Sequence, residues 1–205
     1  MDSLIFDLDG TLWDSRESVV KVWNQVLTEN GINKKTTLDD FTKTMGLQVE
    51  EIGEILLPEL TKEKRHDILE QCNQAENEYL QKNGGILYEQ VEEVLKELKQ
   101  HYRLFIVSNC QDGYIEAFLD YYQLHHFFID YENPGRTGLS KGENIKLIMK
   151  RNQLVSPIYI GDTTGDQAAS EFAGIPFYYA AYGFGEVGDY THKLKRFSDL
   201  LALKK

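Results

Sequence analysis

The sequence predicts an α/β protein with a doubly wound, mostly parallel sheet and an inserted all-helical segment. Short apolar runs that end at turn residues recur along the chain, and such runs are typical of strands buried on both faces of a parallel sheet. Amphipathic helical patterns separate these runs from about residue 85 onward, and this alternation indicates βαβ units. The stretch 15–84 instead carries helical patterns and no strand-like run.

Five apolar runs are the expected strands. The clearest are residues 4–6, 104–107 and 157–160, each of which stops at polar or glycine residues. Residues 175–179 form a fourth run, and residues 126–129 form a weaker fifth. Because they alternate with helical patterns, we expect them to lie in one sheet.

Helices are expected between these strands. Apolar residues follow the three- and four-residue spacing of a helix face in 91–98, 115–122 and 145–149. Ser140 and Glu143 predict a capping box at the start of the last of these helices.

The helical patterns of the inserted stretch predict a second domain. Thr37 is expected to cap one of its helices, and Gly84-Gly85 is the expected hinge through which the chain returns to the sheet. We therefore expect a Rossmann-like core formed by residues 1–14 and 85–205, and an all-helical insert formed by residues 15–84.

Composition and charge restrict the class of protein. The chain has 205 residues, of which 41% are hydrophobic and 27% charged, so a sizeable core is available. The net charge of −11 opposes nucleic-acid binding and binding to anionic membranes. Two cysteines form no disulfide framework, and neither a signal peptide nor a membrane span is evident. We expect a cytoplasmic protein.

The first polar cluster is Asp7-Leu8-Asp9-Gly10-Thr11, directly after the first strand. If the backbone stays extended, Asp7 and Asp9 project to one side, roughly 6–7 Å apart. Two carboxylates that close repel each other unless a cation or a proton lies between them. Gly10 permits a sharp exit from the strand and a close approach of the backbone to a ligand.

Three further polar groups follow strands or begin helices. Ser108 and Asn109 could hold phosphate oxygens, or they could simply cap a helix expected to start near residue 111. Lys141 opposes the dipole of the helix that it begins, so it is either a phosphate-facing charge or a solvated surface lysine. Asp162 and Asp166 are expected to lie one helical turn apart. They are either metal ligands or ordinary acids at the start of a helix, where the helix dipole favours negative charge.

Taken together, these groups predict a metal site with a phosphate position beside it. In a doubly wound sheet, ligands bind outside the carboxyl ends of the strands, where Asp7, Ser108 and Asp162 are expected. Carboxylate and other oxygen ligands suit Mg²⁺, which shares its octahedral shell with substrate phosphate.

The chain resembles the haloacid dehalogenase-like hydrolases. The matching pieces, in the order of that family, are DLDGT at 7–11, VSN at 107–109, SKG at 140–142 and GDTTGD at 161–166. The helical insert is similar to the family's C1 cap. Residues 12–15 (LWDS) and 182–185 (YGFG) resemble the phosphoglycolate-phosphatase-like branch.

The resemblance implies a phosphatase that acts through an aspartyl-phosphate. Asp7 would be the nucleophile, and Asp9 would be the general acid and then the base. Mg²⁺ would be held by Asp7, Asp162 and the main-chain carbonyl of Asp9, with Asp166 supporting that shell. Ser108 and Lys141 would hold the phosphoryl oxygens. Further substrate-binding candidates are Gly10, Thr11 and Asn109.

Several alternatives stay open at this point. A sugar-phosphate mutase shares the core motifs, and a non-enzymatic Mg²⁺-dependent phospho-acceptor would share the acids, whereas Asp9 argues against a true dehalogenase. The expected partner is a small phosphorylated metabolite of unknown identity, and monomer and homodimer are equally open. Arg16, Lys21 and Lys43 are candidate contacts for a distal substrate group. The insert has nine basic and thirteen acidic residues, so no cationic channel stands out.

Overall fold

The computed structural model describes residues 1–203. A six-stranded parallel sheet forms the centre of the molecule. The strand order is β5-β4-β1-β6-β7-β8, and each neighbouring pair is parallel. The strands are β1 (Ser3–Phe6), β4 (Arg103–Val107), β5 (Asp130–Glu132), β6 (Pro157–Gly161), β7 (Phe177–Ala180) and β8 (His192–Leu194). The chain adds β4 and β5 on one side of β1, and then β6, β7 and β8 on the other side. This confirms the predicted doubly wound class.

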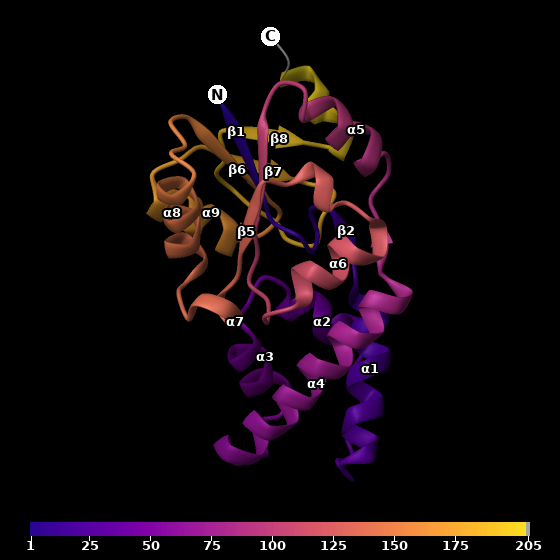
Figure 1. The fold of residues 1–205 in the computed structure, drawn as a ribbon. Coiled ribbons are helices and arrows are strands. Elements are labelled where there is room, and N and C mark those ends of the chain that lie inside the picture. The colour runs from indigo at the N-terminus through magenta and orange to yellow at the C-terminus, as the bar shows by residue number, and fades with distance from the viewer. Residues whose placement is uncertain (204–205) are drawn as a thin grey trace.

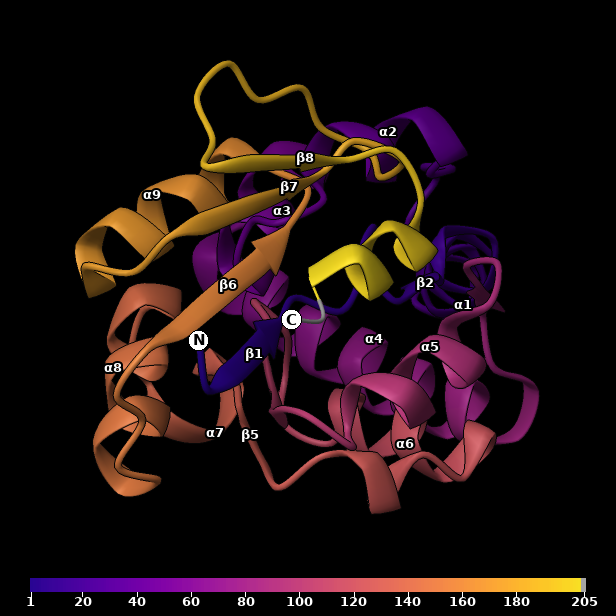
Figure 2. The same cartoon turned by 90° about the horizontal axis from the view of Figure 1, so that it is seen from above.

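Helices cover both faces of this sheet. The helices α8 and α9 lie on one side of it, and α5, α6 and the C-terminal segment lie on the other (Figure 2). Alternate residues of β1 supply the two cores: Leu4 and Phe6 pack with α5 and α6, whereas Ile5 packs with α8 and α9. The core helices are α5 (Val91–Leu98), α6 (Tyr114–Tyr122), η1 (His125–Phe127), α7 (Pro134–Thr137), α8 (Lys141–Arg151), α9 (Thr164–Ala173) and η2 (Phe197–Leu203).

Four helices between β2 and β3 form the insert, which extends from the end of the sheet opposite both termini (Figure 1). They are α1 (Arg16–Glu29), α2 (Leu38–Thr44), α3 (Val49–Leu56) and α4 (Lys62–Asn83). Their apolar faces form a hydrophobic cluster of their own around Trp23, Phe41 and Leu69. The C-terminal end of α4 instead buries Leu80 in the hydrophobic core beside the sheet, so this helix contacts both the insert and the core.

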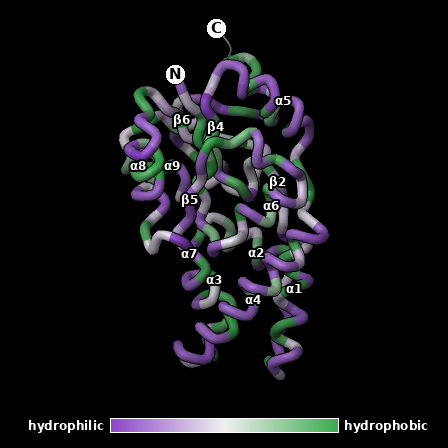
Figure 3. Tube along the Cα trace, in the orientation of Figure 1, coloured by the Kyte–Doolittle hydropathy of each residue, from purple (hydrophilic) through white to green (hydrophobic). Residues whose placement is uncertain are grey.

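Hydropathy follows this division of the chain. Hydrophobic residues gather along the strands inside the core, whereas α4 is mostly hydrophilic (Figure 3). Only a narrow stripe of α4 is buried, which includes Ile68, Leu69 and Cys72. Within residues 1–203, no helix has both the length and the apolar character needed to cross a bilayer.

Two short strands connect the insert to the core. Trp13–Asp14 (β2) pairs antiparallel with Ile86–Leu87 (β3), and the Ser18 hydroxyl donates to the Gly84 carbonyl beside this pair. The sequence patterns did not predict these strands, since two residues are too short for an apolar period.

Three expected elements are displaced. The run 126–129 is not a strand: residues 125–127 form the turn η1, which buries Phe127 and leaves Ile129 exposed, and β5 follows it. The fourth strand begins at Phe177, because Pro176 has no N–H and the amide of Ile175 is used to close α9. The helix expected near residue 111 begins at Tyr114, after Gly113 in a left-handed conformation.

A stability prediction follows from the central position of Phe105. Its side chain is fully buried in β4 between β1 and β5, so Phe105→Ala should lower the free energy of unfolding by about 3–5 kcal/mol. Val155→Ala is the control, because Val155 is 88% exposed and its loss should cost less than about 0.5 kcal/mol. Chemical denaturation measures both. Equal effects would contradict the core described here.

Candidate active site

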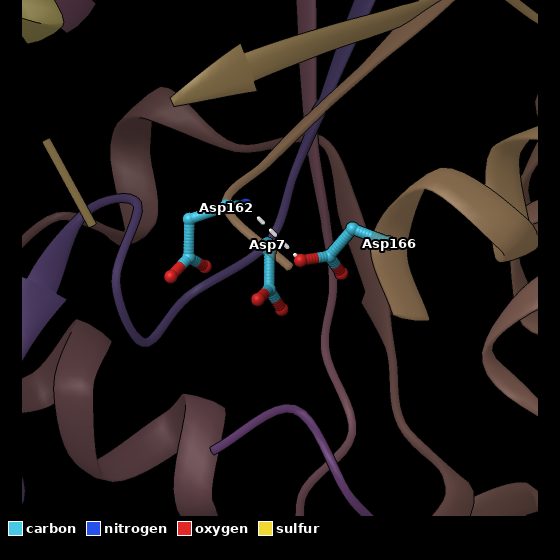
Figure 4. Close-up of side chains that lie close together, drawn as sticks. All are labelled: Asp7, Asp162 and Asp166. Atoms are coloured by element: carbon cyan, nitrogen blue, oxygen red, sulfur yellow. Dashed lines mark hydrogen bonds between the residues drawn. The ribbon is translucent and has the colours of Figure 1, made fainter. Parts of the chain in front are cut away.

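Three buried carboxylates meet at the carboxyl edge of the sheet. Asp7 follows β1, Asp162 follows β6, and Asp166 lies in the first turn of α9. One oxygen of each lies within 4.8 Å of the other two. Figure 4 shows Asp7 between the other two side chains, with the backbone amide of Asp162 bonded to Asp166. Three of the four predicted metal-site acids are therefore brought together.

Local folding fixes Asp166. Thr163 is the N-cap of α9, and its hydroxyl accepts a hydrogen bond from the Asp166 amide while Asp166 accepts from Thr163 in return. One oxygen, Oδ2, accepts from both the amide and the hydroxyl of Thr163 and from the Asp162 amide. The helix cap thus orients a carboxylate whose oxygens are already largely engaged.

Lys141 is a buried member of this cluster, not a solvated surface lysine. Its Nζ donates to Asp7 Oδ1 at 3.0 Å and to Asp166 Oδ1 at 2.6 Å, and the residue is 4% exposed. A capping box formed by Ser140 and Glu143 begins α8 at this lysine, as predicted. Burial alone would lower the pKa of Lys141, but the charges of Asp166 and Asp7 raise it, so the ammonium form is strongly favoured.

The cluster holds more negative charge than Lys141 neutralises. Burial, followed by repulsion from Asp166, raises the pKa of Asp7 to about 6 despite the opposing effects of Lys141 and a hydrogen bond from Ser108. Burial and the charges of Asp166 and Asp7 raise the pKa of Asp162 to about 8. Within residues 1–203, the buried Asp162 Oδ1 has no hydrogen-bond partner. An unpartnered oxygen among repelling carboxylates is what a hard divalent cation such as Mg²⁺ would satisfy, so these residues fit that ion.

Two glycines allow the backbone to approach Asp162 closely. A Cβ on Gly10 would lie 2.2 Å from Asp162 Oδ2, and the φ of +77° at Gly10 disfavours any other residue. A Cβ on Gly183 would lie 2.4 Å from Asp162 Cβ. The amide of Phe184 donates to Asp162 Oδ2 at 2.7 Å, so the loop after β7 completes the surroundings of this acid.

Asp9 lies apart from the three-carboxylate cluster. Its Oδ1 accepts from the Ser15 hydroxyl at 2.5 Å and from the Tyr114 hydroxyl at 3.1 Å. Removal from water, with a further contribution from the charge of Asp7, raises the pKa of Asp9 to about 7, although the bond from Ser15 opposes this. The side chain of Asp9 is therefore not a fourth carboxylate of the cluster, and only its main-chain carbonyl stays a predicted ligand.

The predicted phosphate-binding residues Ser108, Asn109 and Thr11 lie in three different surroundings. Ser108 is buried and lies beside Asp7. Asn109 donates from Nδ2 to the Gly46 carbonyl of the insert at 2.7 Å, and its buried Oδ1 has no hydrogen-bond partner among the residues that the structure describes. Neither residue caps a helix. Thr11 is buried in the turn after β1, where its carbonyl accepts from Tyr182, and it does not line the cavity described next.

A small cavity of about 50 Å³ separates the acids from the insert. Asp7, Asp9, Ser108 and Asn109 line it from the core side, and α1, α3, α4 and the segment 41–47 line it from the insert side. Glu76 of α4 also lines this cavity.

Sequence patterns missed Ser15, Tyr114 and Glu76. Tyr114 and Glu76 reach the site through contacts between residues distant in the chain, and no local motif marks such residues. Ser15 lies only six residues from Asp9 and belongs to the LWDS segment on which part of the resemblance rests, so the sequence did carry a signal for it. Gly183 and Phe184 carried a signal, since they lie in the YGFG segment on which part of the resemblance rests.

The three basic residues expected to meet a distal substrate group are all engaged elsewhere. Arg16 pairs with Asp14 and stacks on the ring of Phe184. Lys21 contacts Tyr79, and Lys43 pairs with Asp39 on the surface of α2. None of the three lines the cavity.

Glu76 gives a pH-dependent stability. Burial raises the pKa of Glu76 from 4.5 to about 7, so the folded state holds its proton more tightly than the unfolded state does. The contribution of Glu76 to stability is therefore complete at low pH and is lost as pH rises through this range. The free energy of unfolding of wild type minus that of Glu76→Gln should fall by on the order of 3 kcal/mol between about pH 4 and about pH 8. Denaturation across this range measures it, and parallel curves would contradict the burial of the charge.

Comparison with known proteins places the chain in a family. The model of the haloacid dehalogenase-like hydrolase family matches residues 4–180. A phosphoglycolate phosphatase of Aquifex aeolicus is 27% identical, over 99% of this chain and 96% of that protein. A crystal structure of a predicted phosphoglycolate phosphatase from Haemophilus somnus superposes with a TM-score of 0.87 at 20% identity, covering 99% of this chain and 97% of that one. A haloacid dehalogenase-like hydrolase structure from Bacteroides fragilis gives a TM-score of 0.84 at 24% identity, covering 97% and 98%. The chain therefore belongs to the haloacid dehalogenase-like hydrolase family, and within it is a phosphatase similar to the phosphoglycolate phosphatases.

Proposed function

We propose that this phosphatase hydrolyses a small phosphate monoester with Mg²⁺ as cofactor and through a phosphate ester formed on Asp7. The single observation that carries the proposal is the buried cluster of Asp7, Asp162, Asp166 and Lys141, which lies beside a cavity at the carboxyl edge of the sheet. Such a cluster combines a nucleophile, cation ligands and a fixed positive charge.

The ion would be held by the side chains of Asp7 and Asp162 and by the main-chain carbonyl of Asp9. Asp166 would support this shell, because its oxygens already accept from Lys141, Thr163 and the Asp162 amide. When bound, Mg²⁺ supplies positive charge that offsets the repulsion among the acids and polarises the phosphoryl group.

In the first step, a carboxylate oxygen of Asp7 forms a bond to phosphorus as the bond to the alcohol oxygen breaks. Asp9, in its protonated form, gives its proton to the leaving alcohol. Ser15 and Tyr114 hold Asp9 for this step, since both donate to its Oδ1. In the second step, water adds to phosphorus, its proton passes to Asp9, and the bond from phosphorus to Asp7 breaks.

Fixed donors would stabilise the charge that develops on the phosphoryl oxygens. The candidates are Lys141 and Ser108, which both contact Asp7, and the amide of Asn109, a residue that lines the cavity beside Asp7. Gly10 would leave the space that lets Asp162 approach, and Thr11 would shape the turn that carries Asp9 and Gly10.

The insert would act as a cap over the reaction. Residues 15–84 would form the cap domain, and residues 1–14 with 85–205 the core, with the β2–β3 pair at their junction. The cavity between the two parts would exclude bulk water from the ester on Asp7.

The substrate is proposed to be a small phosphorylated metabolite. The name of the Aquifex relative suggests 2-phosphoglycolate as one candidate. The two buried free cysteines support a reducing compartment such as the cytoplasm.

The nucleophile is tested with Asp7→Asn. Because the amide cannot form the ester, Mg²⁺-dependent phosphate release from p-nitrophenyl phosphate and small alkyl phosphates should fall at least about 10³-fold. Asp189→Asn, at an exposed acid, is the control and should leave turnover unchanged. Retained turnover in Asp7→Asn would contradict the proposed role, and one-time labelling of wild type by a small phosphodonor would favour a phospho-acceptor instead.

Cation binding is tested without reference to turnover. Mg²⁺ at about 100 times its dissociation constant should raise the free energy of unfolding by about 2.7 kcal/mol, as expected for a ligand that binds only the folded state. Asp162→Asn should remove most of this gain, because it removes the oxygen that lacks a partner. Thermal unfolding with Mg²⁺ and with a chelator measures the effect, and an equal gain in the variant would place the ion elsewhere.

A further inference from the structure

The cavity beside Asp7 is acidic and has no basic residue among the described residues that line it. Its charged lining residues are Asp7, Asp9 and Glu76. The rest of its insert side is mainly apolar and includes Val19, Trp23, Phe41, Met45 and Ile52. The part of a substrate that extends beyond the phosphoryl group would therefore meet apolar walls and one further acid.

That further acid, Glu76, takes no part in the proposed chemistry at phosphorus. It lies on α4 and is 6% exposed. Its Oε2 accepts from Trp23 Nε1 at 2.9 Å, and its Oε1 accepts from Gln111 Nε2 at 3.0 Å. These two donors fix the direction of the carboxylate, but both are neutral, so its charge has no counter-ion among its hydrogen-bond partners.

The approach to the cavity is acidic as well. A larger hollow of about 630 Å³ shares Val49, Asn73, Cys110 and Gln111 with the cavity and opens beside α3 and α4. The acids that line it are Glu50, Glu70, Glu78 and Asp112, and none of its described lining residues is a lysine or an arginine. A negatively charged vestibule raises the local concentration of cations and lowers that of anions.

Two basic groups described above, Lys141 and Arg16, are already paired with carboxylates of the protein. Lys141 is bonded to Asp7 and Asp166, and Arg16 forms a two-point contact with Asp14. A substrate carboxylate in the cavity would therefore face Glu76 with no cation to pair with, which is an unfavourable arrangement for two buried like charges.

We propose that the substrate is a phosphate monoester whose alcohol part carries a positively charged amine, and that Glu76 selects it. This inference rests on the proposed function and names the substrate class of the same site. The amine would lie against the Glu76 carboxylate, with the rings of Trp23 and Phe41 as neighbouring aromatic surfaces. The same charge would disfavour phosphorylated carboxylic acids, so this inference departs from the candidate 2-phosphoglycolate that the name of the Aquifex relative suggests.

Three substrates of similar length test the selection in the wild-type enzyme with Mg²⁺. They are O-phosphoethanolamine, 2-hydroxyethyl phosphate and 2-phosphoglycolate, whose ends are cationic, neutral and anionic. We expect kcat/KM for the amine to exceed that for the carboxylate at least about tenfold, with the neutral compound between them. Equal values, or a preference for 2-phosphoglycolate, would overturn the inference.

Glu76→Gln separates selection from a structural role. The amide keeps the size of the side chain and removes its charge, so kcat/KM for the amine should fall about tenfold while that for the neutral compound stays within about twofold. Glu63→Gln, at an exposed acid on the same helix, is the matched control and should change none of the three. A uniform loss on all three substrates would show that Glu76 only holds the insert in place, and would overturn the assignment.

p-Nitrophenyl phosphate distinguishes failure of this inference from failure of the proposed function. Mg²⁺-dependent hydrolysis of this compound with no preference among the three alkyl phosphates would overturn the amine selectivity alone. Absence of phosphate release from all four compounds would contradict the phosphatase mechanism, and the inference would fail with it.

Discussion

The pairing of one buried ammonium group with two carboxylates joins the parts of the chain on which the site depends. Lys141 begins α8, Asp7 follows β1 and Asp166 belongs to α9, so the two hydrogen bonds of Nζ tie three elements from three regions of the sequence. Three carboxylates still face one ammonium group after this pairing, and a buried oxygen of Asp162 has no hydrogen-bond partner within residues 1–203. A site of this kind gains from binding a cation and, through that cation, a phosphate ester. The arrangement explains how a chain with a net charge of −11 can accept an anion.

The insert gives this cluster its surroundings. Glu76 accepts from Gln111 and Asn109 donates to Gly46, so polar contacts cross from the core to the insert at the edge of the cavity. In the proposed mechanism the core would supply the groups that act on phosphorus, and the insert would supply most of the surface beyond it. Selectivity would then depend on the segment for which sequence motifs give least information.

The sequence predicted the sheet and the acid cluster well for a shared physical reason. Parallel strands end at one edge, so polar residues placed directly after β1, β4 and β6 had to come together. The side chain of Asp9 turned toward Ser15 and Tyr114 because these hydroxyls, 6 and 105 residues away in the chain, offer it hydrogen bonds. Glu76 was missed because it looks like any acid of a hydrophilic helix until the fold buries it against Trp23 and Gln111. Apolar runs also misplaced β5, because Phe127 is buried from a turn and not from a strand.

The capping box at the N-terminus of α9 also affects the position of Lys141. Asp166 closes the capping box with Thr163 through one oxygen and receives Lys141 on the other. Fraying of the first turn of α9 would therefore remove one of the two carboxylates that hold Lys141 and leave only its hydrogen bond to Asp7. The start of α9 and the position of the lysine ammonium group therefore depend on the same carboxylate.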